Sequence, residues 1–192
     1  MKKKFLFIII FLTFLINAQE RPKPGIKTGL NITNITNTNY DFKQDFYIGG
    51  FLTLPFSDFY ILRPELIYSR QGAKLQFDGS SSSKIEIDYF SLAIANKFLI
   101  FKKSDFYAVI GTFIDFKIKD NLESSWEDIF FIIFNWDVGI FVGLEYELSR
   151  NFGIEFRYKR GFADLPKIDQ TYQDGKQSNT VYQIGLKYKF GH

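Results

Sequence analysis

Apolar and polar residues alternate along most of this chain, and this period of two limits its fold more than any other feature. Side chains along a β-strand point to opposite faces in turn, so the pattern predicts strands whose two faces meet different surroundings. The alternating segments are 26–32, 46–54, 62–69, 85–98, 108–119, 136–147, 154–159 and 182–190. We therefore predict an all-β protein of about eight antiparallel strands.

Two places disturb the alternation. Ile85 and Ile87 fall on one parity, whereas Phe90 and the apolar residues after it fall on the other. A one-residue β-bulge near Tyr89 would reconcile the two halves of this strand. Pro64 has no backbone N–H to give to a sheet, so we expect an irregularity there as well.

The connections between the segments alternate in length. Long polar connections are expected at 33–45, 73–84, 120–133 and 164–179, and tight turns at 55–58, 101–105 and 149–151. Short turns at one end and long loops at the other are typical of bacterial outer-membrane barrels. The apolar run 129–134 is interpreted as a strand extension, with a sticky patch for a partner as the alternative.

In a soluble sandwich the apolar faces point inward, whereas a membrane barrel inverts that arrangement. Aromatic residues near the strand ends favour inversion, because they suit the two membrane interfaces. Glycine and charge alternate on the opposite face, which suits a narrow polar lumen. We therefore predict a transmembrane antiparallel up-and-down β-barrel, with Leu144 and Ile154 facing lipid and Glu145 and Glu155 facing the lumen.

The first eighteen residues have the layout of a signal peptide. Lys2–Lys4 give a positive start, Phe5–Ile16 an apolar stretch and Ala18 a small residue before the expected cut at Gln19. The apolar stretch is short for a retained anchor, which is the alternative. We therefore expect residues 1–18 to be a signal peptide and residues 19–192 to form an exported barrel domain.

Composition excludes several function classes. The chain has 24 Lys and Arg against 21 Asp and Glu, and loss of the three leader lysines leaves 24 − 3 = 21 against 21. That balance gives no basic field for a nucleic acid. Cysteine is absent, which excludes a disulfide, a thiol nucleophile or a cysteine–zinc cluster.

No catalytic, cofactor-binding or metal-binding residue is predicted. The single histidine, His192, ends the chain and lacks the fixed geometry that proton transfer needs. Asp164, Asp169 and Asp174 lack a recognised calcium spacing. The acids expected in the lumen are Glu65, Asp88, Asp115, Asp137, Glu145 and Glu155, and the cations are Arg63, Lys97, Lys117, Arg157, Lys159 and Lys187. We expect these charges to neutralise one another, with acid–base catalysis as the weaker alternative.

Several stretches carry a resemblance to a known family. Residues 25–31, 62–69, 71–74 and 142–148 resemble the small outer-membrane β-barrels called porin-family or PorT-like, and Pro64-Glu-Leu-Ile-Tyr-Ser69 is the most distinctive element. Residues 183–190 resemble the C-terminal signal read by the barrel-assembly machinery. The resemblance implies a cell-envelope protein of the outer membrane, surrounded by lipid and lipopolysaccharide.

Three functions stay open at this stage. The leading one is a non-enzymatic structural or interaction barrel that works through its extracellular loops or an envelope partner. A narrow porin-like channel is the first alternative, although Phe51, Ile67, Val109, Phe113 and Phe141 are expected to fill the lumen. A PorT-like component of a protein-secretion apparatus is the second.

Overall fold

The structure, a computed structural model, describes residues 22–36, 41–76, 82–102, 104–120, 136–163 and 178–191. Predictions on the signal peptide and its cut after Ala18, on the run 129–134, on His192 and on the aspartates of residues 164–177 lie outside these residues. The described residues contain no helix that is long and apolar enough to cross a membrane.

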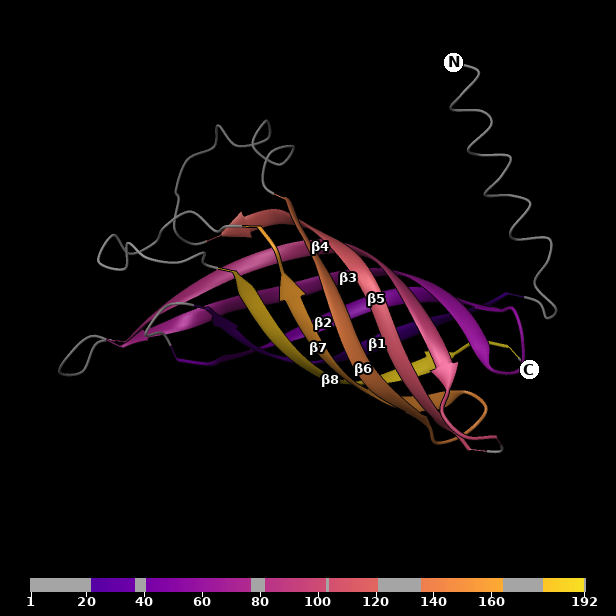
Figure 1. The fold of residues 1–192 in the computed structure, drawn as a ribbon. Helices are drawn as coiled ribbons and strands as arrows, with labels where there is room; N and C mark the ends of the chain where they lie inside the picture. Colours follow the sequence, from indigo (N-terminus) through magenta and orange to yellow (C-terminus); the bar gives the residue numbers. More distant parts are fainter. Residues whose placement is uncertain are drawn as a thin grey trace, which may run out of the picture.

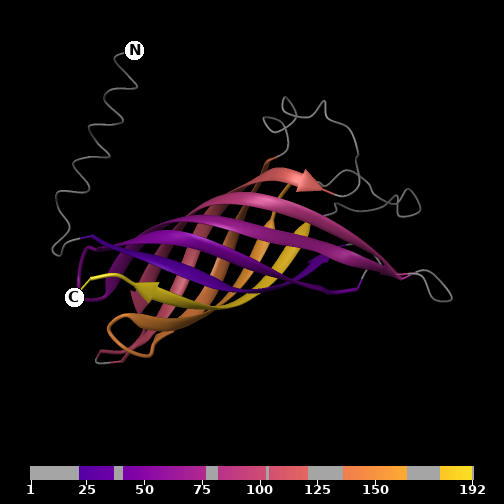
Figure 2. The same ribbon diagram turned by 180° about the vertical axis from the view of Figure 1, so that it is seen from behind.

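The described residues form eight strands that close into one barrel (Figures 1 and 2). The strands are β1 (Lys23–Ile35), β2 (Lys43–Pro55), β3 (Tyr60–Gln76), β4 (Ser82–Leu99), β5 (Phe106–Asp120), β6 (Trp136–Glu147), β7 (Phe152–Gly161) and β8 (Asn179–Lys189). Each pairs antiparallel with its chain neighbours, and β1 pairs with β8 from Gly25↔Lys189 to Ile35↔Asn179. The predicted up-and-down barrel is confirmed.

The two ends of the barrel differ. The turns β2–β3, β4–β5 and β6–β7 lie at the same end as the start of β1 and the end of β8 (Figure 1). The ends of β1, β3, β5 and β7 lie at the other end, where all connections except the one from β3 to β4 span more residues than these turns. The predicted loop 73–84 is wrong in extent, because β3 continues to Gln76 and β4 begins at Ser82. Ala73 and Ile85 are paired and fully buried, so this hairpin extends past its neighbours despite its serine-rich sequence.

Nearly all buried strand residues carry odd numbers. Lys27 and Lys187 are buried, whereas their neighbours Ile26 and Leu186 are more than half exposed on the outer surface. Leu144 and Ile154 likewise face outward, and Glu145 and Glu155 face inward. The prediction that the apolar face points outward is therefore confirmed.

The predicted change of phase in β4 is wrong. Ile85 and Ile87 stay on the inward face with Tyr89, where they pack with Ile35 and Ala73 in an apolar cluster. The inward residues of β4 at this level are therefore apolar, although they keep the same odd parity as the polar inward residues further along the strand.

A bulge does occur at this level, but on the partner strand. The β4–β5 register shifts between Asp88 and Tyr89, which pair with Lys119 and Lys117 and leave Ile118 as the extra residue of β5. Irregularity at Pro64 is confirmed, because the β2–β3 pairing is interrupted between Phe51↔Glu65 and Leu54↔Leu62.

The seam between β1 and β8 depends on two glycines. Gly29 and Gly185 are paired across it, and a Cβ added to Gly185 would lie 2.0 Å from the Tyr47 hydroxyl and 2.6 Å from the Thr28 carbonyl. Tyr47 is fully buried and donates a hydrogen bond of 2.9 Å to Glu155. The glycine pair thus makes room for a tyrosine that holds a luminal carboxylate.

We expect Gly185→Ala to lower the free energy of unfolding by about 1–3 kcal/mol, because the added methyl overpacks the seam. Gly50→Ala is the matched control, since its Cβ would meet only the Gly25 carbonyl, at 3.7 Å. Urea unfolding in lipid vesicles measures both. Equal unfolding midpoints would contradict the packing role of Gly185.

A second prediction concerns the outward face. Ile154 lies between the ring pairs Phe152–Tyr188 and Tyr158–Tyr182. Ile154→Arg should destabilise the barrel by about 2–4 kcal/mol if this position meets the bilayer centre. Asp58→Arg in the exposed β2–β3 turn is the control, and similar losses for both variants in vesicles would argue against a lipid-facing Ile154.

Candidate functional site: the barrel interior

Two carboxylates from adjacent levels of the lumen share three cations. Arg157 of β7 donates two hydrogen bonds to Glu65 of β3, Nη1–Oε2 at 2.7 Å and Nη2–Oε1 at 2.6 Å. The Lys27 ammonium lies 3.1 Å from Glu65 and 2.5 Å from Glu155. Arg63 Nε donates to Glu65 at 2.8 Å. All five side chains are buried, so each charge depends on its partners rather than on water.

A second group lies nearer the end with the short turns. Glu145 of β6 forms ion pairs with Lys97 and Lys187. Glu147 lies 3.1 Å from the Lys97 ammonium, 2.6 Å from that of Lys187 and 2.5 Å from that of Lys189. Arg63 Nη1 lies 2.7 Å from Glu145, so the two groups form one continuous network.

Aromatic rings fill the space beside the cations. The Arg63 guanidinium lies 5.2 Å from the centre of the Phe51 ring, and the Arg157 guanidinium 4.6 Å from that of Phe141. The Lys159 ammonium lies 3.9 Å from the Phe113 ring centre. Cations at these distances are attracted to the ring faces. The five residues predicted to fill the lumen are all buried, as expected: Phe51, Ile67, Val109, Phe113 and Phe141.

The charge becomes sparser toward the end with the long connections. Lys159 holds Asp115 at 2.9 Å and 3.1 Å, and Gln71 donates to the same carboxylate at 3.2 Å. Asp137 accepts hydrogen bonds from the backbone N–H groups of Phe162 and Ala163, at 2.9 and 2.7 Å. Beyond this level the interior holds the apolar cluster of β1, β3 and β4, together with the buried polar side chains of Thr33, Lys43 and Asn179. The network is thus strongest between the middle of the barrel and the short turns.

Most of the predicted luminal charges meet in this network. Asp88 is a correction: it faces outward and pairs with Arg70 at 2.8 Å, because the odd-numbered residues of β4 point inward throughout. Lys117 precedes the bulge and is half-buried. The alternation places Lys27, Tyr47, Glu147 and Lys189 on the luminal face, although the predicted set of mutually neutralising charges does not include them.

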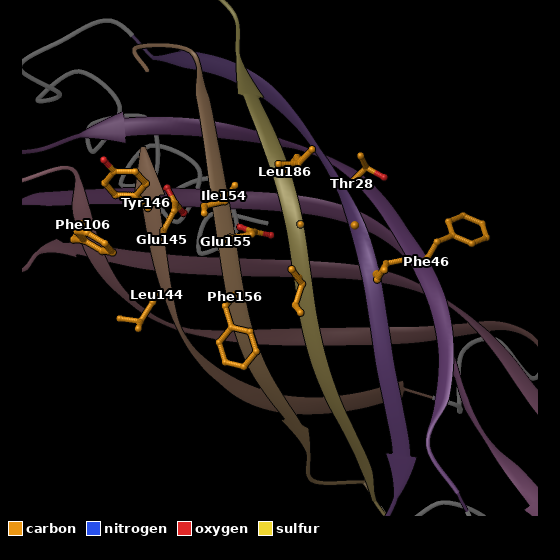
Figure 3. Close-up of a pocket in the computed structure, with 14 residues that line it drawn as sticks. Thr28, Phe46, Phe106, Leu144, Glu145, Tyr146, Ile154, Glu155, Phe156 and Leu186 are labelled. Carbon is orange, nitrogen blue, oxygen red and sulfur yellow. The ribbon is translucent and has the colours of Figure 1, made fainter. Parts of the chain in front are cut away.

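The paired side chains and the rings beside them fill the described middle of the lumen. Each central carboxylate is enclosed by cations, and no group of three potential metal ligands occurs among the described side chains. A hollow of about 650 Å³ lies instead against the outer surface of the barrel (Figure 3). Its apolar lining includes Leu30, Leu144, Ile154, Phe156, Ile184 and Leu186. This hollow belongs to the surface that faces lipid.

Comparison with known proteins agrees with this geometry. Residues 17–166 match the model of the outer membrane protein beta-barrel domain. The chain belongs to this family. Its membership confirms the predicted outer-membrane barrel. No curated protein matches the chain.

Solved structures of outer-membrane proteins share the fold of this chain. Neisserial surface protein A is 12% identical with a TM-score of 0.57, and the match covers 89% of this chain and 100% of that one. The Yersinia pestis protein Ail, in a phospholipid nanodisc, is 15% identical with a TM-score of 0.51, covering 88% and 100%. At this identity the similarity shows the fold alone.

The network predicts a large effect at Glu145. Glu145→Gln leaves Arg63, Lys97 and Lys187 with one carboxylate fewer, and should lower the free energy of unfolding by about 3–5 kcal/mol. Asp58→Asn in an exposed turn is the control. Adding Lys187→Met to Glu145→Gln should restore part of the loss, because it removes a cation that has lost a partner.

Urea unfolding in vesicles measures all three variants. If Glu145→Gln unfolds at the same urea concentration as Asp58→Asn, water screens the luminal charges and the loss of one partner carries no burial cost.

Proposed function

We propose that this protein is a non-enzymatic outer-membrane barrel whose role is structural or interactive, and that it acts through its outer surface and its long connections. One observation carries the proposal: the interior is occupied by buried ion pairs and rings contributed by nearly every strand. Because the described side chains fill the middle of the lumen, the proposal places contacts with other molecules at the rim and the outer wall.

In this proposal the chain is exported and inserted by the barrel-assembly machinery. The short turns and the strand ends Lys23 and Lys189 face the periplasm, and the longer connections face the cell exterior, as in bacterial single-chain barrels. Lipopolysaccharide and other outer-membrane lipids would then surround the wall.

The proposal predicts negligible conductance for solutes of sugar size, because eight strands enclose a space that side chains can fill. Planar-bilayer recordings of the folded protein measure it. The double variant Glu65→Ala/Arg157→Ala removes two large luminal side chains and should raise the ion leak, which shows that the assay detects an opened lumen. Large, stable, reproducible steps in the unaltered protein would instead favour the channel.

A further inference from the structure

An aromatic row crosses the outer face of four strands near the end with the long connections. The registers align Tyr68 of β3, Phe90 of β4, Phe116 of β5 and Trp136 of β6 side by side. Phe90 and Trp136 are well exposed, and the other two rings are half-buried. Aromatic side chains on the outer wall of a barrel lie at the boundary between hydrocarbon and headgroups. The row therefore indicates that the membrane interface crosses this part of the outer wall.

The next row of outward-facing residues on β3, β4 and β5, two positions nearer the long connections on β3 and β4, is charged. Arg70 of β3 pairs with Asp88 of β4, which pairs in turn with Lys119 of β5. Arg70 Nε donates to Asp88 at 2.8 Å, and the guanidinium lies 5.7 Å from the Phe46 ring centre. Two residues along a strand span about 7 Å. This row consequently lies at the level of the lipid headgroups.

The bulge in β5 places Lys119 in that row. With an unbroken register, Ile118 would oppose Asp88, and Lys119 would point into the lumen beside Ile87. The extra residue instead brings Lys119 opposite Asp88, and both Ile118 and Lys119 are exposed on the outer surface. Bulges commonly re-aim a side chain in this way. Lys117 lies half-buried on the other side of the bulge.

Cations are grouped on this side of the barrel, together with acids that include the exposed Asp41, which forms a β-bridge to Lys74. The outward charges of β3, β4 and β5 at or beyond this level, among described side chains, are Arg70, Lys74, Lys84 and Lys119 against Glu86 and Asp88. On β7 and β8, the aromatic pair Tyr158–Tyr182 is followed by one described outward cation, Arg160. Both sides carry aromatic residues, but among the described side chains only the β3–β5 side groups several cations.

We propose that this basic face binds the phosphate of an outer-leaflet lipid headgroup, with Arg70 and Lys119 as the binding side chains. Arginine offers a planar pair of donors to phosphate, and lysine adds a point charge. Asp88 holds Arg70 in place, and the acyl chains lie against the aromatic row below. Basic residues next to a membrane attract anionic headgroups. This inference rests on the proposed placement of the long connections at the cell exterior.

The test uses the folded full-length barrel in detergent and three probes: lipid A with two phosphates, the same lipid after dephosphorylation, and inorganic phosphate. Native mass spectrometry gives the relative affinities. The unaltered protein should prefer phosphorylated over dephosphorylated lipid A about tenfold, and Lys119→Gln should reduce that preference about fivefold. Lys119→Arg should retain it. Arg160→Gln, a lone outward cation of the other side, should leave it unchanged.

Heat-modifiable gel mobility verifies that each variant is folded before binding is measured. Equal binding of the two lipids by the unaltered protein would overturn the site, and so would equal effects of Lys119→Gln and Arg160→Gln. Displacement of lipid A by millimolar inorganic phosphate would show that the face takes free phosphate rather than a lipid. The conductance measurement is independent of these results, so failure of the lipid site and failure of the proposed function are told apart.

Discussion

Hydrocarbon offers no hydrogen bonds, and the rest of this structure depends on that constraint. Each backbone N–H and C=O at membrane depth needs a partner within the protein, at a cost of several kcal/mol for each one left without. Pairing of β1 with β8 leaves no edge, so the sheet is closed. Closure also directs every second side chain of each strand into one narrow lumen. The polar side chains among them need hydrogen bonds or ion pairs there.

The luminal partners are unequal in number. Lys27, Arg63 and Arg157 share Glu65 and Glu155, and a similar excess of cations surrounds Glu145 and Glu147. Buried ion pairs add little net stability over apolar packing, but losing one partner is costly. The network therefore acts more as a constraint on which side chains can coexist than as a source of stability, and the rings beside the cations complete the packing.

Alternation predicted the strands and the inverted faces, because period two is a property of the backbone that any strand must follow. It could not predict the chemistry along each face. Ile85 and Ile87 seemed to belong with the lipid-facing residues because their side chains are apolar, yet they pack inside. Asp88 was expected inside because its side chain is charged, yet it faces outward. The pairing of Lys27 with Glu155 depends on the strand register and on the distance across the barrel. Neither can be read from the sequence of one strand.

The continuity of the luminal network has a consequence for how this barrel enters a membrane. Its charges come from β1, β3, β4, β6, β7 and β8, so a partly assembled sheet would turn unpaired ammonium and carboxylate groups toward lipid. Strands inserted one at a time would each carry that penalty. Closure thus completes two sets of pairs together: β8 brings Lys187 to the carboxylates of β6, and Lys27 of β1 reaches Glu155 of β7.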